Sequence, residues 1–238
     1  MKAKSALLSE HRRNIAKKRK RKTGAVTARL PHATRRAQIL AQAAEFFAEY
    51  GLTAQTRALA EVCGISQRLL YRFFPNKAAL IEEVYKAEIA GPFKAIWFAD
   101  LADRGRPVEQ RLNDFYARYY DEVLTQRWLR LFLYASLADI GMAPAYISTI
   151  LTHMLEVIVG EAAHELGLPL PADRAMVHEL GWSLHGAISH LAIRRRIYSN
   201  TNPPPAAAIV PIYVGVFLAG LPAALRPVPN PRNGQIVA

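Results

Sequence analysis

Apolar residues recur at helical spacing along most of the chain. From residue 34 onward, a first helix turns Leu40, Ala43 and Phe47 to one side. Two shorter helices follow on either side of a turn at residues 63 and 64, and their inward positions are Leu59, Val62, Ile65, Leu70, Phe73 and Phe74. No run alternates with a period of two for long enough to indicate a sheet. The pattern therefore predicts an all-α protein.

The turn at residues 63 and 64 has the residue types of a helix-turn-helix. Gly64 can take the positive φ that ends a helix sharply. Ser66 can cap the next helix, because its hydroxyl can accept a bond from a backbone N–H that lacks a partner. Ala60 is small enough for the two helices to cross closely. We therefore predict a helix-turn-helix whose second helix covers residues 66–73.

The outer face of that second helix carries polar side chains. Gln67 and Tyr71 are four residues apart, as are Arg68 and Arg72, so all four can share one outward face. Such a helix fits the major groove of DNA, where arginine pairs with guanine and glutamine with adenine. The alternative is a solvated face on a small helical bundle. The complete pattern favours DNA recognition.

Proline and glycine separate further apolar segments of helical length in the rest of the chain. We expect helices at about 77–90, 92–103, 108–125, 127–140, 143–166, 172–197 and 205–225. No repeat of 20 to 50 residues is present. The resulting regions are a basic arm (1–33), a helix-turn-helix domain (34–80), a helical body (81–225) and a flexible C-terminal tail (226–238).

Positive charge is concentrated in the arm. The chain has a formal net charge of +12. Residues 1–33 hold eleven lysines and arginines against Glu10 alone, a net +10, including the run KKRKRK at 17–22. Like charges repel, so we expect this arm to be disordered in the free protein. It would add a salt-sensitive contact to phosphates or a minor groove. The alternatives are a solubilising extension or a start codon placed too early.

The residues of the helix-turn-helix resemble the tetracycline-repressor (TetR) family of bacterial transcription regulators. The resemblance covers about 50 residues and rests on Ile39-Leu40, Ala43, Phe47, Gly51, Leu59-Ala60-Glu61, Gly64-Ile65-Ser66, Leu70-Tyr71-Arg72, Phe74-Pro75-Asn76-Lys77 and Leu80. It implies a three-helix DNA-binding domain followed by a helical domain that binds a small molecule and dimerises.

Departures from the family pattern affect the expected DNA contacts. The loop between Gly51 and Leu59 is one residue shorter, so the phosphate-contacting position falls on Gln55 or Thr56. Phe73 stands where the family often has histidine. Arg68 and Leu69 replace a small residue and threonine at the front of the recognition helix, so the operator sequence does not carry over.

Basic residues outside the recognition helix complete the candidate interface. Arg35 and Arg36 place positive charge at a helix start, where it opposes the helix dipole, so phosphate contact is the better account of both. Lys77 follows Asn76, a candidate cap, at the start of another helix, where backbone N–H groups can help to hold a phosphate. The candidate DNA-binding residues are Arg35, Gln55, Thr56, Arg57, Ser66, Gln67, Arg68, Leu69, Tyr71, Arg72 and Lys77.

Aromatic residues are dense in the first half of the body. At helical spacing such residues usually form the core. A pocket lined by aromatic rings would also accept an apolar or aromatic ligand. The candidate ligand-binding residues are Trp97, Tyr116, Tyr119, Trp128 and Phe132.

Enzyme chemistry finds little support in the sequence. It contains no glycine-rich phosphate loop, nucleophile elbow or CxxC motif. His153 with Glu156 and Glu161 with His164 are spaced to share helix faces, but they make a poor metal cage. We therefore expect no catalytic residues, metal or cofactor. Cys63 is the single cysteine, and the chain lacks the apolar core of a signal peptide, so we expect a cytoplasmic protein.

The stretch from 206 to 225 has no charged residue and is long enough to span a bilayer. Its prolines and the family pattern favour another role, in which the last two helices, about 172–197 and 205–225, form a dimer interface. We expect a homodimer that binds a palindromic DNA operator, without membrane contact, and is released by a small effector; repression is the commoner family outcome. The alternatives are an architectural nucleic-acid-binding protein driven by the arm, and a helical metal-binding enzyme.

Overall fold

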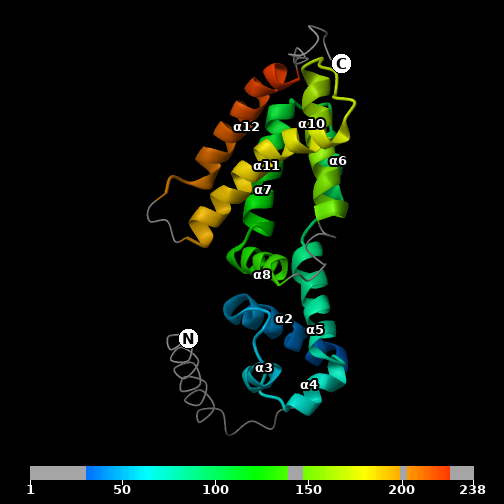
Figure 1. Cartoon of the computed structure of the whole chain (residues 1–238), viewed down its shortest axis with the longest axis vertical. Coiled ribbons are helices and arrows are strands. Elements are labelled where there is room, and N and C mark those ends of the chain that lie inside the picture. The colour runs from blue at the N-terminus through cyan, green and yellow to red at the C-terminus, as the bar shows by residue number, and fades with distance from the viewer. Residues whose placement is uncertain (1–30, 139–146, 199–202, 226–238) are drawn as a thin grey trace, which may run out of the picture.

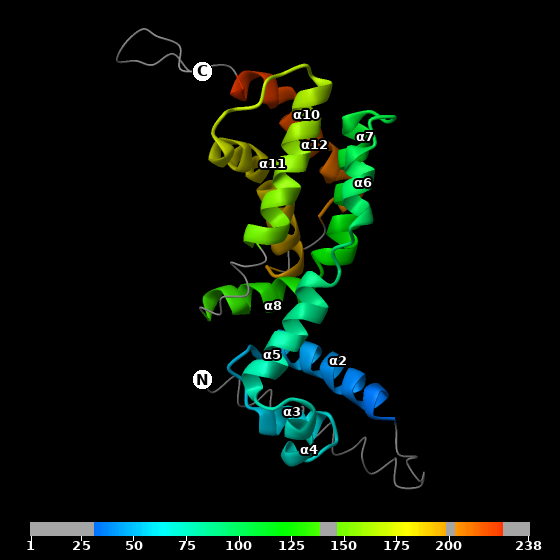
Figure 2. The ribbon, with the colours of Figure 1, turned by 90° about the vertical axis from the view of Figure 1, so that its right-hand side faces the viewer.

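The computed structural model describes residues 31–138, 147–198 and 203–225, and every regular element within these ranges is helical. The expected all-α class is confirmed. Figures 1 and 2 show a small head joined through one helix, α5, to a larger body. Most of the basic arm (1–30) and the predicted flexible tail (226–238) lie outside the described residues.

The head consists of four helices around one core. They are α2 (His32–Tyr50), α3 (Thr56–Val62), α4 (Gln67–Phe73) and α5 (Lys77–Tyr85). The inward apolar positions of the sequence pattern meet in this core, where Phe47, Leu59, Leu70, Phe74 and Leu80 are at most 1% exposed. Burial of these side chains is the main force that holds α3 and α4 against α2.

The ends of the short head helices follow the predicted capping pattern. The Ser66 hydroxyl accepts a hydrogen bond from the backbone N–H of Leu69 at 3.1 Å. The side-chain oxygen Oδ1 of Asn76 accepts one from the backbone N–H of Ala79 at 2.8 Å. Gly64 has φ +67° at the turn between α3 and α4. All three predictions are confirmed, and together they fix the direction in which α4 leaves the turn.

Replacing Gly64 with alanine is expected to lower the free energy of unfolding by about 1 kcal/mol, because alanine adopts positive φ poorly. No atom lies within 4 Å of the position of the new Cβ, so the effect would come from the backbone alone. Gly160 lies inside a body helix with equally open space and no positive φ, so alanine there should be neutral or stabilising. Urea denaturation of both variants measures the difference. Equal losses would contradict the assigned turn.

The body continues from α5 through a π-helical turn at Lys86–Ala90. Its helices are α6 (Ile96–Ala102), α7 (Val108–Arg118), α8 (Gln126–Leu137), α10 (Thr152–Glu165), α11 (Arg174–Arg196) and α12 (Ala206–Ala224). Further π-helical turns extend α7 at Tyr119–Val123 and precede α10 at Ile147–Leu151. The predicted segments correspond to these helices, but the helix expected at 92–103 begins only at Ile96. Residues 139–146, which include the predicted start of α10, lie outside the described residues.

An arginine lies buried between α7 and α10. The side chain of Arg111 is 1% exposed. It forms ion pairs with Glu161 at 3.0 Å and Glu165 at 3.2 Å. It also donates to the backbone carbonyls of Leu101 and Arg106. Arg104 and Arg111 donate hydrogen bonds to Glu161 and hold the pKa of its carboxyl group below the usual value. This cluster ties α7 and the preceding loop to α10.

Helix α12 is long and apolar enough to cross a membrane, with a mean hydropathy of 2.0, and it is the one such helix in the described ranges. It packs against α7 and α11 (Figure 1). Its buried residues are Val210, Val214, Phe217 and Leu221. Only 22% of the most apolar 18-residue stretch of this helix is buried. The opposite side is therefore an exposed apolar surface, in which Ile212 is 56% and Val216 is 68% exposed.

Candidate nucleic-acid interface

Helices α3 and α4 lie at the end of the described structure that is farthest from the body, as both views show (Figures 1 and 2). This position follows from the buried side of α4, where Leu70 inserts into the head core. The other side of α4, with Gln67, Arg68, Tyr71 and Arg72, is exposed. A helix presented at the tip of a compact head is the arrangement that enters a major groove.

The four polar side chains of α4 form two pairs with different surroundings. Arg68 and Arg72 are exposed, and neither forms an ion pair with any residue that the structure describes. Gln67 and Tyr71 are also exposed, but both hydrogen-bond to the hydroxyl of Thr56 on α3. The expected outward face therefore has two parts. Arg68 and Arg72 have no ion-pair partner among the described residues, whereas Gln67 and Tyr71 are hydrogen-bonded to Thr56.

The other candidate DNA-binding residues surround α4 at different depths. Gln55 is the exposed N-cap of α3, whereas Thr56 is only 6% exposed. Arg57 is exposed and lies 3.8 Å from Glu61. Ser66 is exposed and caps α4, and Leu69 is half-buried. Thr56 is thus largely buried and its hydroxyl bonds side chains of α4, so Gln55 is the more accessible of the two phosphate candidates.

The two basic candidates at helix starts are both partly exposed. Arg35 lies in the first turn of α2, and the adjacent Arg36 instead pairs with Glu83 of α5 at 2.9 Å and lies over the Phe74 ring. Lys77 opens α5 beside the Asn76 cap, and partial burial lowers the pKa of its ammonium group. Arg35 and Lys77 are therefore available for phosphates, while Arg36 holds α2 against α5.

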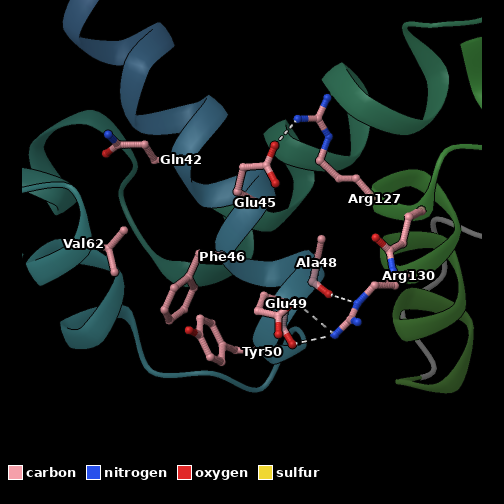
Figure 3. A pocket seen from close by; sticks show the side chains of 10 residues that line it. Gln42, Glu45, Phe46, Ala48, Glu49, Tyr50, Val62, Arg127 and Arg130 are labelled. Carbon is pink, nitrogen blue, oxygen red and sulfur yellow. Dashed lines mark hydrogen bonds and ion pairs between the residues drawn. The ribbon is translucent and has the colours of Figure 1, made fainter. Parts of the chain in front are cut away.

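A groove of about 400 Å³ lies between α2 of the head and α8 of the body, and the sequence analysis did not predict it. Figure 3 shows Phe46 and Tyr50 along this groove and two arginines of α8 at its edge. Arg127 pairs with Glu45 of α2 at 2.5 Å. Arg130 donates to the carbonyls of Ala48 and Glu49 at the end of α2. These contacts connect α8 directly to the last turn of α2.

The arginines at this junction bridge residues about 80 positions apart in the chain. A signal was present in the sequence, since Glu45 and Glu49 are one turn apart on α2, while Arg127 and Arg130 are three apart on α8. Two acidic and two basic residues with matching helical spacing are typical of helices that pack side by side. Nothing in the local pattern identified these two helices as partners.

The candidate ligand-binding residues occupy the body core. Trp97, Tyr116 and Tyr119 are at most 1% exposed and belong to one aromatic cluster from α6, α7 and the turn after it. Trp128 and Phe132 stack on α8 with ring centroids 4.8 Å apart, and the Trp128 indole N–H donates to the Ile89 carbonyl. The five candidates from the sequence therefore fall into two aromatic groups. Trp97, Tyr116 and Tyr119 belong to the core cluster, and Trp128 and Phe132 lie together on α8.

His185 of α11 joins the core aromatic cluster. Its ring lies 6.1 Å from that of Tyr116 and 5.4 Å from that of Tyr119. Burial lowers the pKa of the imidazole to about 4, so this histidine is neutral at physiological pH. Burial also raises the pKa of Tyr116. The cluster therefore presents neutral polar groups within an apolar environment.

The acidic residues considered as metal ligands have other partners. Glu156 pairs with Arg174 at 2.6 Å and lies 2.7 Å from Nε2 of His178. Glu161 pairs with Arg104 and Arg111. The described residues contain no cluster of three potential metal-binding side chains. These carboxylates connect helices of the body.

Comparisons with known proteins agree with this architecture. Residues 39–84 match the family model of bacterial regulatory proteins, tetR family. No curated protein matches the sequence. Among solved structures, the chain resembles a TetR-like transcriptional regulator from Rhodococcus sp. RHA1, with a TM-score of 0.60, 20% identity, and coverage of 81% of this chain and 100% of the other.

Two further solved structures share the fold. The ketosteroid transcriptional regulator KstR2 of Mycobacterium tuberculosis aligns with a TM-score of 0.55 and 21% identity over 83% of this chain and 96% of the other. The fatty acid degradation regulator FadR from Bacillus halodurans aligns with a TM-score of 0.59 and 13% identity over 80% and 97%. Residues 39–84 thus carry the pattern of bacterial regulatory proteins of the tetR family, and about four-fifths of the chain shares the fold of TetR-like transcriptional regulators.

Proposed function

We propose that this regulator is a homodimeric, cytoplasmic repressor that binds a palindromic operator and releases it when a small apolar or aromatic compound enters the body. The observation that carries DNA recognition is the pair Arg68 and Arg72, exposed on α4 and without acidic partners in the described chain. An unpaired guanidinium on a helix at the tip of the head is suited to base edges or phosphates. Arg35, Gln55 and Lys77 would contact the backbone around it.

Replacing Arg68 with alanine tests this assignment. Operator affinity should fall at least tenfold, because each good bidentate base contact contributes roughly 1–3 kcal/mol and a dimer loses two of them. Fluorescence anisotropy measures the loss, with an operator obtained by selection from a random DNA pool. Light scattering checks that the oligomeric state is unchanged. The control is Arg174→Ala, which removes an exposed arginine of the body. A dimer that dissociates, or an equal effect at Arg174, would refute the placement of Arg68 in the interface.

Helices α11 and α12 support the proposed dimer. The exposed side of α12 carries Ile212 and Val216 among small residues, and it adjoins α11. A continuous apolar surface of this kind is suited to pairing with the same surface of a second copy. The two heads would then meet successive turns of the DNA.

The aromatic core supports an effector that is apolar and uncharged. Tyr116 and the neutral His185 offer hydrogen-bonding groups, while Trp97 and Tyr119 offer aromatic surface. Two regulators of the same fold are named for ketosteroids and for fatty acid degradation. Trp128 and Phe132 on α8 extend the proposed binding region toward the head. An effector that displaces α8 would act on α2 through Arg127 and Arg130.

The basic arm would add affinity that does not depend on the operator sequence. Deleting residues 1–30 removes eleven lysines and arginines. The deletion should weaken binding to every DNA sequence and reduce the slope of log K against log salt by several units, because fewer counterions are released. Binding titrations at several salt concentrations measure this slope. An unchanged slope would show that the arm makes no phosphate contacts.

The charge of the arm also supports a second function, that of an architectural nucleic-acid-binding protein. In that case the arm would supply most of the affinity and the body would bind no effector. The same deletion would then abolish binding rather than weaken it, and the full-length protein would show little sequence preference.

A further inference from the structure

Thr56, the first residue of α3, lies beneath the recognition helix α4. Its side chain is 6% exposed. Its hydroxyl oxygen lies 3.1 Å from Nε2 of Gln67 and 2.8 Å from the hydroxyl oxygen of Tyr71. Gln67 and Tyr71 are one helical turn apart, and both are exposed. A single buried hydroxyl therefore holds two side chains on the surface that would meet DNA.

The protons of this group can be assigned from its bonds. A hydroxyl donates one proton and can accept two bonds. Thr56 Oγ1 accepts an amide N–H of Gln67. If Thr56 donates its own proton to Tyr71, its buried hydroxyl is satisfied, and the proton of the Tyr71 hydroxyl is free to point outward. If Tyr71 donated instead, the buried proton of Thr56 would need another acceptor, and the described residues provide none.

We propose that Thr56 is a positioning residue that fixes which end of the Gln67 amide faces the DNA, so that Gln67 selects a base carrying an amino group. This inference rests on the proposed function, because it requires α4 to lie in a major groove. With Nε2 held by Thr56, the free end of Gln67 is its carbonyl oxygen, which only accepts hydrogen bonds. The strand facing Gln67 would carry adenine or cytosine at that position.

The chemistry of the major groove supports this preference. Adenine presents its N6 amino group there and cytosine its N4 amino group. Guanine presents the acceptors N7 and O6, and thymine presents O4, so either would place an acceptor against the Gln67 carbonyl. A glutamine without a tether can rotate its amide and offer either end. One hydrogen bond to Thr56 biases this choice by about two- to tenfold.

The test compares base preferences of the full-length protein and its variants in selections from a random DNA pool. Gln67→Ala identifies the base pair that Gln67 contacts, because discrimination is lost there. Every base pair carries one amino group in the major groove, on adenine or cytosine, so the contacted base must be identified separately. The preference of the unmodified protein at that pair should disappear in a probe duplex whose adenine or cytosine lacks this amino group. Thr56→Val keeps the branched shape of the side chain and removes the hydroxyl. It should reduce this preference about two- to tenfold and leave the other positions unchanged. Thr56→Ser keeps the hydroxyl and should retain the preference.

Gln67→Glu tests the same inference without altering the buried residue. A carboxylate has only acceptor oxygens, so it should retain the preference for adenine or cytosine. The inference is overturned if Gln67 contacts guanine or thymine, if Gln67→Ala changes no position, if Thr56→Val keeps the full preference, or if Gln67→Glu reverses it. In each case a symmetric motif would leave the proposed function standing. A pool without any enriched motif would refute both.

Discussion

Replacing both Ile212 and Val216 with glutamate is expected to convert the proposed dimer into monomers and to lower operator affinity at least a hundredfold. These side chains are 56% and 68% exposed on α12, so their replacement alters no contact of the body core. Four carboxylates would meet in the proposed interface without basic partners on α12. A monomer binds only one half-site, so it loses the avidity of two linked heads, which typically raises affinity 10²–10⁴-fold.

Analytical ultracentrifugation and operator titration measure the two effects on the same samples. The control is Ile96→Glu, which changes an exposed apolar residue at the start of α6, outside the proposed interface, at 58% exposure. It tests whether added negative charge alone weakens DNA binding. If the double variant remains a dimer with unchanged affinity, the exposed side of α12 is not the dimer interface, and the membrane alternative for this helix regains weight.

Replacing Arg111 with methionine is expected to lower the free energy of unfolding by about 3 kcal/mol. Methionine fills much of the space, but it leaves Glu161 and Glu165 with weaker pairing and two backbone carbonyls without their donor. Breaking a buried ion pair by removing one partner typically costs about 3–5 kcal/mol. The lower end applies here because Arg104 still pairs with Glu161, and Glu165 is partly exposed.

Urea denaturation at one fixed protein concentration measures this loss, since a dimer gains stability with concentration. Arg118→Met is the matched control on the same helix, where a partly exposed arginine pairs with Asp100 at 2.8 Å. That pair should contribute less than about 1 kcal/mol. Arg111→Lys should recover only part of the loss, because an ammonium group cannot reproduce the fork of the guanidinium. Equal losses at Arg111 and Arg118 would mean that the Arg111 cluster is not buried.

Local sequence pattern was sufficient to predict the head. The spacing of apolar residues located α2, α3 and α4, and Ser66, Gly64 and Asn76 marked their ends. Such signals act over a few residues, so one sequence can reveal them. The expected helix at 92–103 began too early, because residues 91–95 form the turn that follows the π-helical segment before α6. Pro92 lacks the N–H that would continue the helix.

The contacts between distant segments could not be predicted in this way. Thr56 was one of two candidates for a phosphate contact, and the sequence did not reveal that its hydroxyl bonds residues 11 and 15 positions further along the chain. Arg130 reaches α2 across 82 residues, and Arg111 reaches Glu161 across 50. Each pairing depends on how helices pack, and the periodicity of one helix does not specify its neighbour. Burial likewise distinguishes Thr56 from Gln55, which the sequence left as equal candidates.

Selection of bound DNA from a random duplex pool, at physiological salt, tests the central claim most directly. The claim is that two copies of α4 read one operator, with the arm adding affinity that is independent of sequence. Full-length and arm-deleted protein should therefore enrich the same two-fold symmetric motif, with half-sites about one helical turn, 10–10.5 base pairs, apart or at a multiple of that spacing. No enriched motif from either protein would contradict the claim and favour the architectural function.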